Sequence, residues 1–161
     1  MVKVLIVYDS TYGCTERIAQ TIGRALDPTQ QVSTVRASDA KPEHMVGVKL
    51  LIVGSPTQGG RPTQAVQEFL KAIPEEGLLG VAVAAFDTRV PARWVGIFGY
   101  AAENIFDTLK KKSGIPVMPP EGFFVTGKEG PLKEGESERA ALWAEMLMTA
   151  MARSGRPRAN G

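Results

Sequence analysis

Apolar blocks alternate along the chain with longer segments in which apolar residues recur every three or four positions. Three blocks are almost continuously apolar, namely KVLIVYD (3–9), VKLLIVGS (48–55) and GVAVAAFD (80–87). Such runs are typical of strands that are buried on both faces of a parallel sheet. QVSTVRA (31–37) alternates and predicts a strand nearer a sheet edge. The prolines of IPVMPPEGFFVTG (115–127) predict an edge strand or a bulge.

Helical spacing of apolar residues follows four of these strands. It predicts helices from Thr15 to Leu26, after Thr63, over 99–113, and from Ser137, which we expect to cap the last helix. KPEHM (41–45) is long enough for one helical turn. Strands that alternate with helices predict an α/β domain. Right-handed crossovers then give a doubly wound, five-stranded parallel sheet in a three-layer α/β/α arrangement.

The loops after the three buried strands carry most of the candidate chemistry. They are DSTYGCT (9–15), SPTQGGRP (55–62) and FDTRVPARWVGIFG (86–99), and they are rich in glycine, hydroxyl and aromatic side chains. In doubly wound sheets, ligands bind beyond the carboxyl ends of the strands. We therefore expect the functional site among these three loops, and not at the plainer connections at the opposite end.

The first loop joins a buried strand directly to a helix. The unpaired N–H groups and partial positive charge at the start of a helix favour a bound phosphate. Ser10, Thr11 and Thr15 add hydroxyl donors, and Gly13 lets the backbone curve around the anion. The loop contains no lysine or arginine, and it matches neither the Walker pattern nor the dinucleotide-binding glycine pattern. The alternative is an ordinary capped turn with Thr15 as the N-cap.

Composition mainly excludes other kinds of protein. A chain of 161 residues suits one domain, which we place at 1–152, followed by a basic tail at 153–161 that we expect to be disordered. Three of the 19 basic residues lie in this tail, so the body is slightly acidic and lacks the pattern of nucleic-acid-binding proteins. No apolar run approaches ~20 residues, so we expect no membrane contact. One cysteine and one histidine exclude a Cys/His zinc site and favour a cytoplasmic setting.

Taken together, the three loops resemble those of the flavodoxin family. DSTYGCTE is similar to the phosphate signature that follows the first strand in that family, and GSPTQGGRP is similar to its second flavin loop. FDTR and FGYAAENI occupy the place of the third loop. The resemblance covers roughly residues 2–152 and is of the short-chain type. It implies the strand order 2-1-3-4-5 and a bound flavin mononucleotide (FMN).

The resemblance also implies which residues hold FMN. The isoalloxazine ring would lie between the second and third loops, and the phosphate would lie in the first. The phosphate residues are Ser10, Thr11, Tyr12, Gly13, Cys14 and Thr15. The residues around the ring are Ser55, Pro56, Thr57, Gln58, Gly59, Gly60, Phe86, Asp87, Thr88, Arg89 and Trp94.

The aromatic residues near the ring depart from the family pattern. Gln58 stands where family members typically carry a tryptophan, so that stacking partner is missing or is replaced by backbone and amide. Trp94 is then the best candidate to cover the ring, with Phe86 and Phe98 behind it. Core packing is the alternative interpretation of these aromatic residues.

Charge near the ring departs from the family as well. The second and third loops contribute Arg61, Arg89 and Arg93 against Asp87, whereas flavodoxins generally surround the flavin with acids. Three arginines should stabilise the anionic, fully reduced flavin and so raise the reduction potential at which it forms. They could instead offer a site to an acidic partner or an anionic substrate. Solvated surface arginines are the alternative. Cys14 lies at a helix start that would lower its thiol pKa, but a bound phosphate opposes this, so we expect it to contribute only its backbone N–H.

Three functions remain open from the sequence. The first is an FMN protein that carries electrons between redox partner proteins, namely a reductase and an acceptor. The second is an FMN-dependent oxidoreductase that acts on a quinone or a porphyrinogen-like substrate. The third is a flavodoxin-like domain that has lost its flavin and serves as a binding module. A phosphoacceptor receiver domain is excluded because Ser55 stands where its aspartate belongs.

Overall fold

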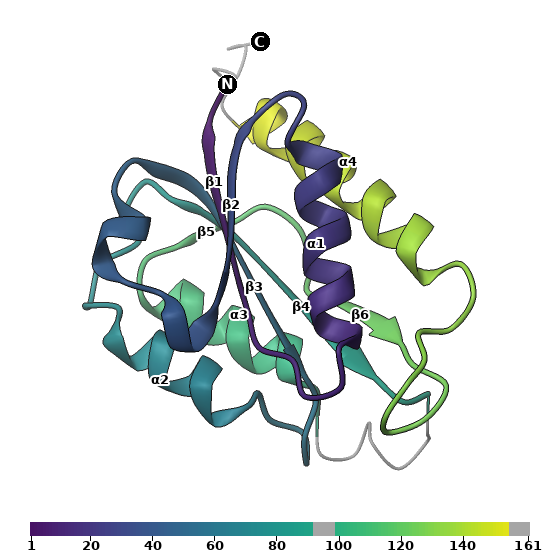
Figure 1. Ribbon diagram of the computed structural model, residues 1–161. Coiled ribbons are helices and arrows are strands. Elements are labelled where there is room, and N and C mark those ends of the chain that lie inside the picture. The colour runs from purple at the N-terminus through teal and green to yellow at the C-terminus, as the bar shows by residue number, and fades with distance from the viewer. Residues whose placement is uncertain (92–98, 155–161) are drawn as a thin grey trace, which may run out of the picture.

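A parallel β-sheet forms the middle layer of the molecule (Figure 1). The computed structural model describes residues 1–91 and 99–154. Four strands follow one another across the sheet in the order β2 (Gln31–Arg36), β1 (Lys3–Tyr8), β3 (Val48–Pro56) and β4 (Ala82–Arg89). The far edge is formed by β5 (Ile115–Pro116) and β6 (Glu121–Phe124). All neighbouring pairs are parallel. The observed order confirms the predicted order 2-1-3-4-5.

The fifth strand position is interrupted, as its prolines predict. Strand β5 pairs with Ala82 and Val83 of β4, and β6 pairs with the segment 86–89 of the same strand. Pro119 and Pro120 lie between the two short strands and have no N–H to donate to the ladder. The break therefore falls at a sheet edge, where a missing ladder bond disturbs only one neighbour.

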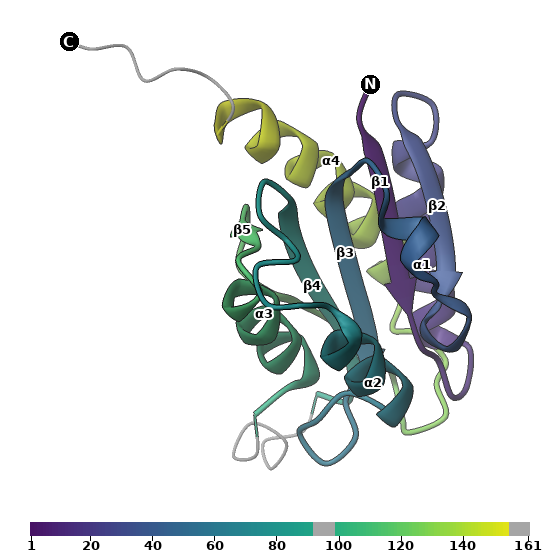
Figure 2. The same ribbon diagram turned by 90° about the vertical axis from the view of Figure 1, so that its left-hand side faces the viewer.

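Two pairs of helices cover the two faces of the sheet (Figures 1 and 2). Helices α1 (Cys14–Leu26) and α4 (Glu136–Ser154) pack on one face. Helices α2 (Gln64–Ala72) and α3 (Ala101–Lys111) pack on the other face. The buried strands β1, β3 and β4 send alternate side chains into each of the two resulting cores. The predicted three-layer α/β/α architecture is therefore confirmed.

Helix ends differ slightly from the expected ones. Helix α4 begins at Glu136, so Ser137 lies inside its first turn instead of capping it. The segment 41–45 forms a short 3₁₀ helix at Pro42–Met45, and a second 3₁₀ turn covers Ala37–Asp39. In the described ranges, no helix is long and apolar enough to cross a membrane.

The carboxyl ends of the parallel strands lie at the lower end of the molecule in Figure 1. The β1–α1 and β3–α2 loops gather there, together with the loop between β6 and α4. This is the edge at which the sequence places the functional chemistry.

Candidate functional site

The β1–α1 loop starts its helix one residue earlier than the sequence suggests. Gly13 is the N-cap, with a φ of 94° that L side chains rarely adopt, and its N–H donates to Ser10 Oγ at 3.0 Å. Thr15 lies in the first turn and is almost fully buried, with its Oγ1 2.8 Å from Thr88 Oγ1. The alternative in which Thr15 caps the helix is therefore wrong, because its hydroxyl already links the loop to β4.

Three backbone N–H groups at this helix start are available to a ligand. The first α-helical hydrogen bond joins the N–H of Arg17 to the carbonyl of Gly13 at 3.0 Å. The N–H groups of Cys14, Thr15 and Glu16 precede it and have no acceptor among the described residues. This end of α1 thus offers backbone donors and a partial positive charge to an anion.

The β3–α2 loop forms a tight hairpin turn. Gln58 and Arg61 form backbone hydrogen bonds in both directions, at 2.9 and 3.1 Å. Gly59 and Gly60 between them have φ of 57° and 80°, as hairpin turns of this length require. The Gln58 side-chain amide donates to Thr11 Oγ1 at 3.0 Å, so it bridges the first and second loops.

Ser55 and Phe86 support the loops from inside the protein. Ser55 is buried, and its Oγ accepts a hydrogen bond from the N–H of Thr63 at 3.0 Å. Phe86 is fully buried and packs edge-on against Phe123 and Trp143, with ring centroids 6.1 Å away in both cases. Phe86 thus packs in the core, as the alternative interpretation of these aromatic residues predicts.

The end of β4 holds an arginine in a fixed position. Asp87 is fully buried and accepts two hydrogen bonds from Arg89, at 2.7 and 2.8 Å, and one from the N–H of Ala102 at 2.9 Å. The Arg89 guanidinium also lies 3.5 Å from the ring centroid of Tyr100. Thr57 Oγ1 accepts from the N–H of Ala101 at 3.1 Å. The second and third loops are thus both tied to the start of α3.

A cavity of about 580 Å³ lies among these loops. Its size suits a small-molecule or cofactor site. Eleven predicted site residues line it: Ser10, Thr11, Tyr12, Cys14, Thr15, Pro56, Thr57, Gln58, Gly59, Thr88 and Arg89. Gly13, Ser55, Gly60, Phe86 and Asp87 are not among the lining residues. Trp94, Arg93 and Phe98 lie outside the described residues.

The loop between β6 and α4 supplies lining residues that the sequence analysis missed. Val125 and Lys128 line the cavity, as does Val90 after β4. This loop packs directly on the first one, because a Cβ added to Gly130 would lie only 2.7 Å from Cys14 Sγ. The sequence could have pointed to this loop, because ligands bind beyond the carboxyl ends of the parallel strands and the loop follows the fifth strand.

Packing also changes the pKa of the Cys14 thiol. Burial raises its pKa above the ordinary value, and the positive charge of Arg17 opposes this only in part. The lowering of this pKa that we expected at a helix start is therefore not found. The thiol acts as a small packing group in the β1–α1 loop, where Gly130 lies against it.

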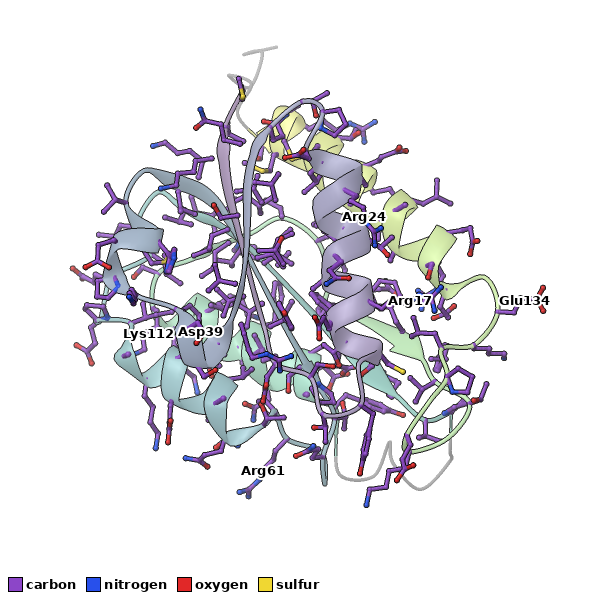
Figure 3. The ribbon with its side chains drawn as sticks, in the orientation of Figure 1. Arg17, Arg24, Asp39, Arg61, Lys112 and Glu134 are labelled. Atoms are coloured by element: carbon purple, nitrogen blue, oxygen red, sulfur yellow. The ribbon has the colours of Figure 1, made fainter. Side chains whose placement is uncertain are left out.

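The electrostatics of the cavity favour an anion. No carboxylate is among its described lining residues, and the acids flanking the first loop are paired: Arg36 contacts Asp9 at 3.2 Å and Glu16 at 3.1 Å. Arg89 is neutralised by Asp87, whereas Lys128 takes part in none of the ion pairs among the described residues. Arg61 is exposed, does not line the cavity, and extends away from the ribbon in Figure 3.

The fold is similar to several solved structures. Oxidised flavodoxin 1 from Bacillus cereus superposes with a TM-score of 0.77 at 17% identity, covering 91% of this chain and 97% of that one. Flavodoxin 2 from Bacillus cereus gives a TM-score of 0.77 at 24% identity, covering 92% and 99%. Rubredoxin oxygen:oxidoreductase from Desulfovibrio gigas gives 0.74 at 20% identity, covering 96% of this chain but 37% of that one.

Sequence comparison agrees with the fold. No curated protein sequence matches the chain at a significant level. A family model described as flavodoxin, however, matches residues 6–143, which include all three predicted loops. Because this match spans most of the chain, the protein belongs to the flavodoxin family.

Proposed function

We propose that this protein binds FMN in the cavity at the carboxyl edge of its sheet and carries electrons between redox partner proteins in the cytoplasm. Flavodoxins in general are FMN-binding electron carriers. Bound FMN supplies one- and two-electron transfer, and the chain's own residues bind it, orient it and set its electrostatic surroundings. The observation that carries the proposal is a cavity lined by all three predicted loops, with no carboxylate in the described part of its lining.

The phosphate end of the cavity is the better defined part. The backbone N–H groups of Cys14 and Thr15 and the hydroxyls of Ser10 and Thr11 would donate to the phosphate oxygens. Gly13, with its φ of 94°, turns the backbone directly into the helix start that carries these N–H groups. The pairing of Asp9 and Glu16 with Arg36 reduces their repulsion of the anion. The residues present therefore fit a phosphate.

The ring end of the cavity is defined, among the described residues, by the second and third loops. Gln58 and Gly59 form its rim on the side of the second loop, and Arg89 is fixed on the side of the third. Among the described lining residues, Tyr12 is the aromatic one, and 49% of it is exposed. A ring exposed beside Gln58 would suit electron transfer at the protein surface. It would equally suit the second candidate, an oxidoreductase acting on a quinone or porphyrinogen-like substrate.

Titration of the flavin-free protein with FMN tests the proposal. We expect stoichiometric quenching of FMN fluorescence with a dissociation constant of about 1 μM or below. Thr11→Val removes a phosphate donor and the acceptor of the Gln58 bridge, and it should weaken binding about tenfold. Thr108→Val on α3, whose hydroxyl bonds only to the Asn104 carbonyl, is the matched control and should leave FMN binding unchanged. Absence of quenching by wild-type protein would contradict FMN binding and favour the flavin-free binding module.

A kinetic assay separates the two redox candidates. The FMN-loaded protein is given NAD(P)H and a quinone under steady-state conditions. An electron carrier should show negligible turnover until a reductase is added. Rapid turnover by the protein alone would favour the oxidoreductase.

A further inference from the structure

The β6–α4 loop brings a lysine to the cavity that the phosphate loop itself does not contain. Lys128 lines the same cavity as Ser10, Thr11 and Cys14, although more than a hundred residues separate it from them in sequence. The β1–α1 loop has no lysine or arginine of its own. A phosphate held there by neutral donors alone would lack a counter-charge.

Backbone hydrogen bonds across the loop that carries Lys128 stabilise it at its base and nearer its tip. At its base, Val125 and Leu132 form an antiparallel bridge, and the N–H of Lys133 donates to the Phe124 carbonyl at 2.9 Å. Nearer the tip, the N–H of Thr126 donates to the Pro131 carbonyl at 2.9 Å. This hairpin-like arrangement presents Lys128 near its tip.

Contacts with two other elements hold the two sides of the loop in place. On one side, Gly130 packs on Cys14, so closely that an added Cβ would lie 2.7 Å from Sγ. On the other side, the N–H of Phe124 donates to the Glu136 carboxylate at 2.7 Å, which anchors the loop to the start of α4. The position of Lys128 beside the cavity is therefore built into the fold.

The charge of Lys128 is free to act on a ligand. It takes part in none of the ion pairs found among the described residues, and Arg89, the other cation among the described lining residues, is paired with Asp87. Glu134, an acid of the same loop, extends outward in Figure 3. A flavin phosphate carries between one and two negative charges at pH 7.

We propose that Lys128 is the cationic ligand of the phosphate bound by the β1–α1 loop, and that it makes the site select FMN over riboflavin. The proposal rests on the FMN site proposed above. The lysine acts from a distant segment of the chain and supplies the counter-charge that a flavin without a phosphate does not need. Its contribution is therefore specific to the phosphorylated cofactor.

Paired titrations with FMN and riboflavin test this assignment. Lys128→Gln should weaken FMN binding about tenfold and leave riboflavin binding within about twofold of wild type. Lys128→Arg should restore most of the FMN affinity. Raising the salt concentration should weaken FMN binding to wild type more than to Lys128→Gln, because an ion pair is screened. Lys133→Gln is the matched control, since it removes the same charge from the same loop outside the cavity lining.

The outcomes distinguish this proposal from the one on which it rests. If wild type binds FMN and Lys128→Gln behaves like Lys133→Gln, the role of Lys128 is overturned while the FMN site stands. Equal weakening of FMN and riboflavin would also overturn it, because the effect would then not concern the phosphate. If wild type binds neither flavin, the proposed function itself fails.

Discussion

Two arginine–carboxylate clusters in this protein have the same construction. In each, a buried carboxylate accepts a backbone N–H from another element and two hydrogen bonds from an arginine that lies on an aromatic ring. In the first, Asp87 of β4 holds Arg89 on Tyr100 and accepts from α3. In the second, Glu136 of α4 holds Arg139, whose guanidinium lies 4.5 Å from the Phe123 ring centroid.

The clusters differ in where the arginine faces. Arg89 lines the cavity and is 15% exposed, while its carboxylate partner is fully buried. Arg139 does not line the cavity, and it also pairs with Glu121 and donates to the Gly122 carbonyl. The same arrangement thus fixes a cation beside the ligand site in one place and ties a strand to a helix in the other. The comparison indicates that this arrangement of arginine, carboxylate and aromatic ring does not by itself mark a residue of the cavity.

Removal of the fully buried carboxylate should have the largest effect. Asp87→Asn keeps an acceptor for the N–H of Ala102 but leaves the Arg89 guanidinium without its counter-charge in a poorly hydrated position. We expect the free energy of unfolding to fall by about 3 kcal/mol, measured by urea denaturation at pH 7.

A surface pair provides the control for this change. Asp107 contacts Lys110 at 3.5 Å, and both side chains are largely exposed. Asp107→Asn should lower the free energy of unfolding by about 0.5 kcal/mol or less. A similar cost for both substitutions would mean that burial of Asp87 does not set the strength of its pair.

The second cluster should contribute less to the free energy of unfolding, and its contribution should depend on pH. The hydrogen bonds from Arg139 hold the pKa of Glu136 below its ordinary value, with a further contribution from the N–H of Phe124, although burial opposes them. The ionised carboxylate therefore stabilises the fold above its unfolded-state pKa, and this contribution is lost as the pH falls through the folded-state pKa. Glu136→Gln should lower the free energy of unfolding by about 2 kcal/mol at pH 7.

Urea denaturation at several pH values measures this dependence. The difference in the free energy of unfolding between wild type and Glu136→Gln should become smaller as the pH falls below about 4. Glu138→Gln, on the exposed side of the same helical turn, should give a small and nearly constant difference. A gap for Glu136→Gln that does not change with pH would show that the carboxylate charge is not what stabilises the loop.

Local sequence patterns predicted most of the fold. The apolar blocks and helical spacing identified the five strand positions and the four α-helices of the described residues, because these signals lie within each segment, whereas the 3₁₀ turn Ala37–Asp39 was not predicted. The sequence also predicted the break in the fifth strand, since proline removes a ladder donor wherever it stands. The resemblance of three loops, in the order in which the flavodoxin family carries them, implied the family and the strand order, and both are confirmed.

Long-range packing was beyond the reach of those patterns. Phe86 lies in a strand buried on both faces, so no periodicity shows which face it occupies. Its position is set by Trp143 from α4 and by Gly54, where an added Cβ would overlap the Phe86 ring. Lys128 belongs to no motif, and its approach to the cavity depends on Cys14 and Glu136, which are remote in sequence.

Two aromatic rings that lie at different distances from the two arginines should give the smallest effects and the sharpest comparison. The Arg89 guanidinium lies 3.5 Å from the Tyr100 centroid, whereas Arg139 lies 5.9 Å from that of its half-buried neighbour Phe124. Double-mutant cycles with leucine at the ring and methionine at the arginine, followed by urea denaturation, isolate each pair. We expect a coupling energy of about 1 kcal/mol for Arg89–Tyr100 and less than about 0.5 kcal/mol for Arg139–Phe124. A larger coupling for the second pair would mean that carboxylate contacts, and not ring distance, decide how firmly each arginine is held.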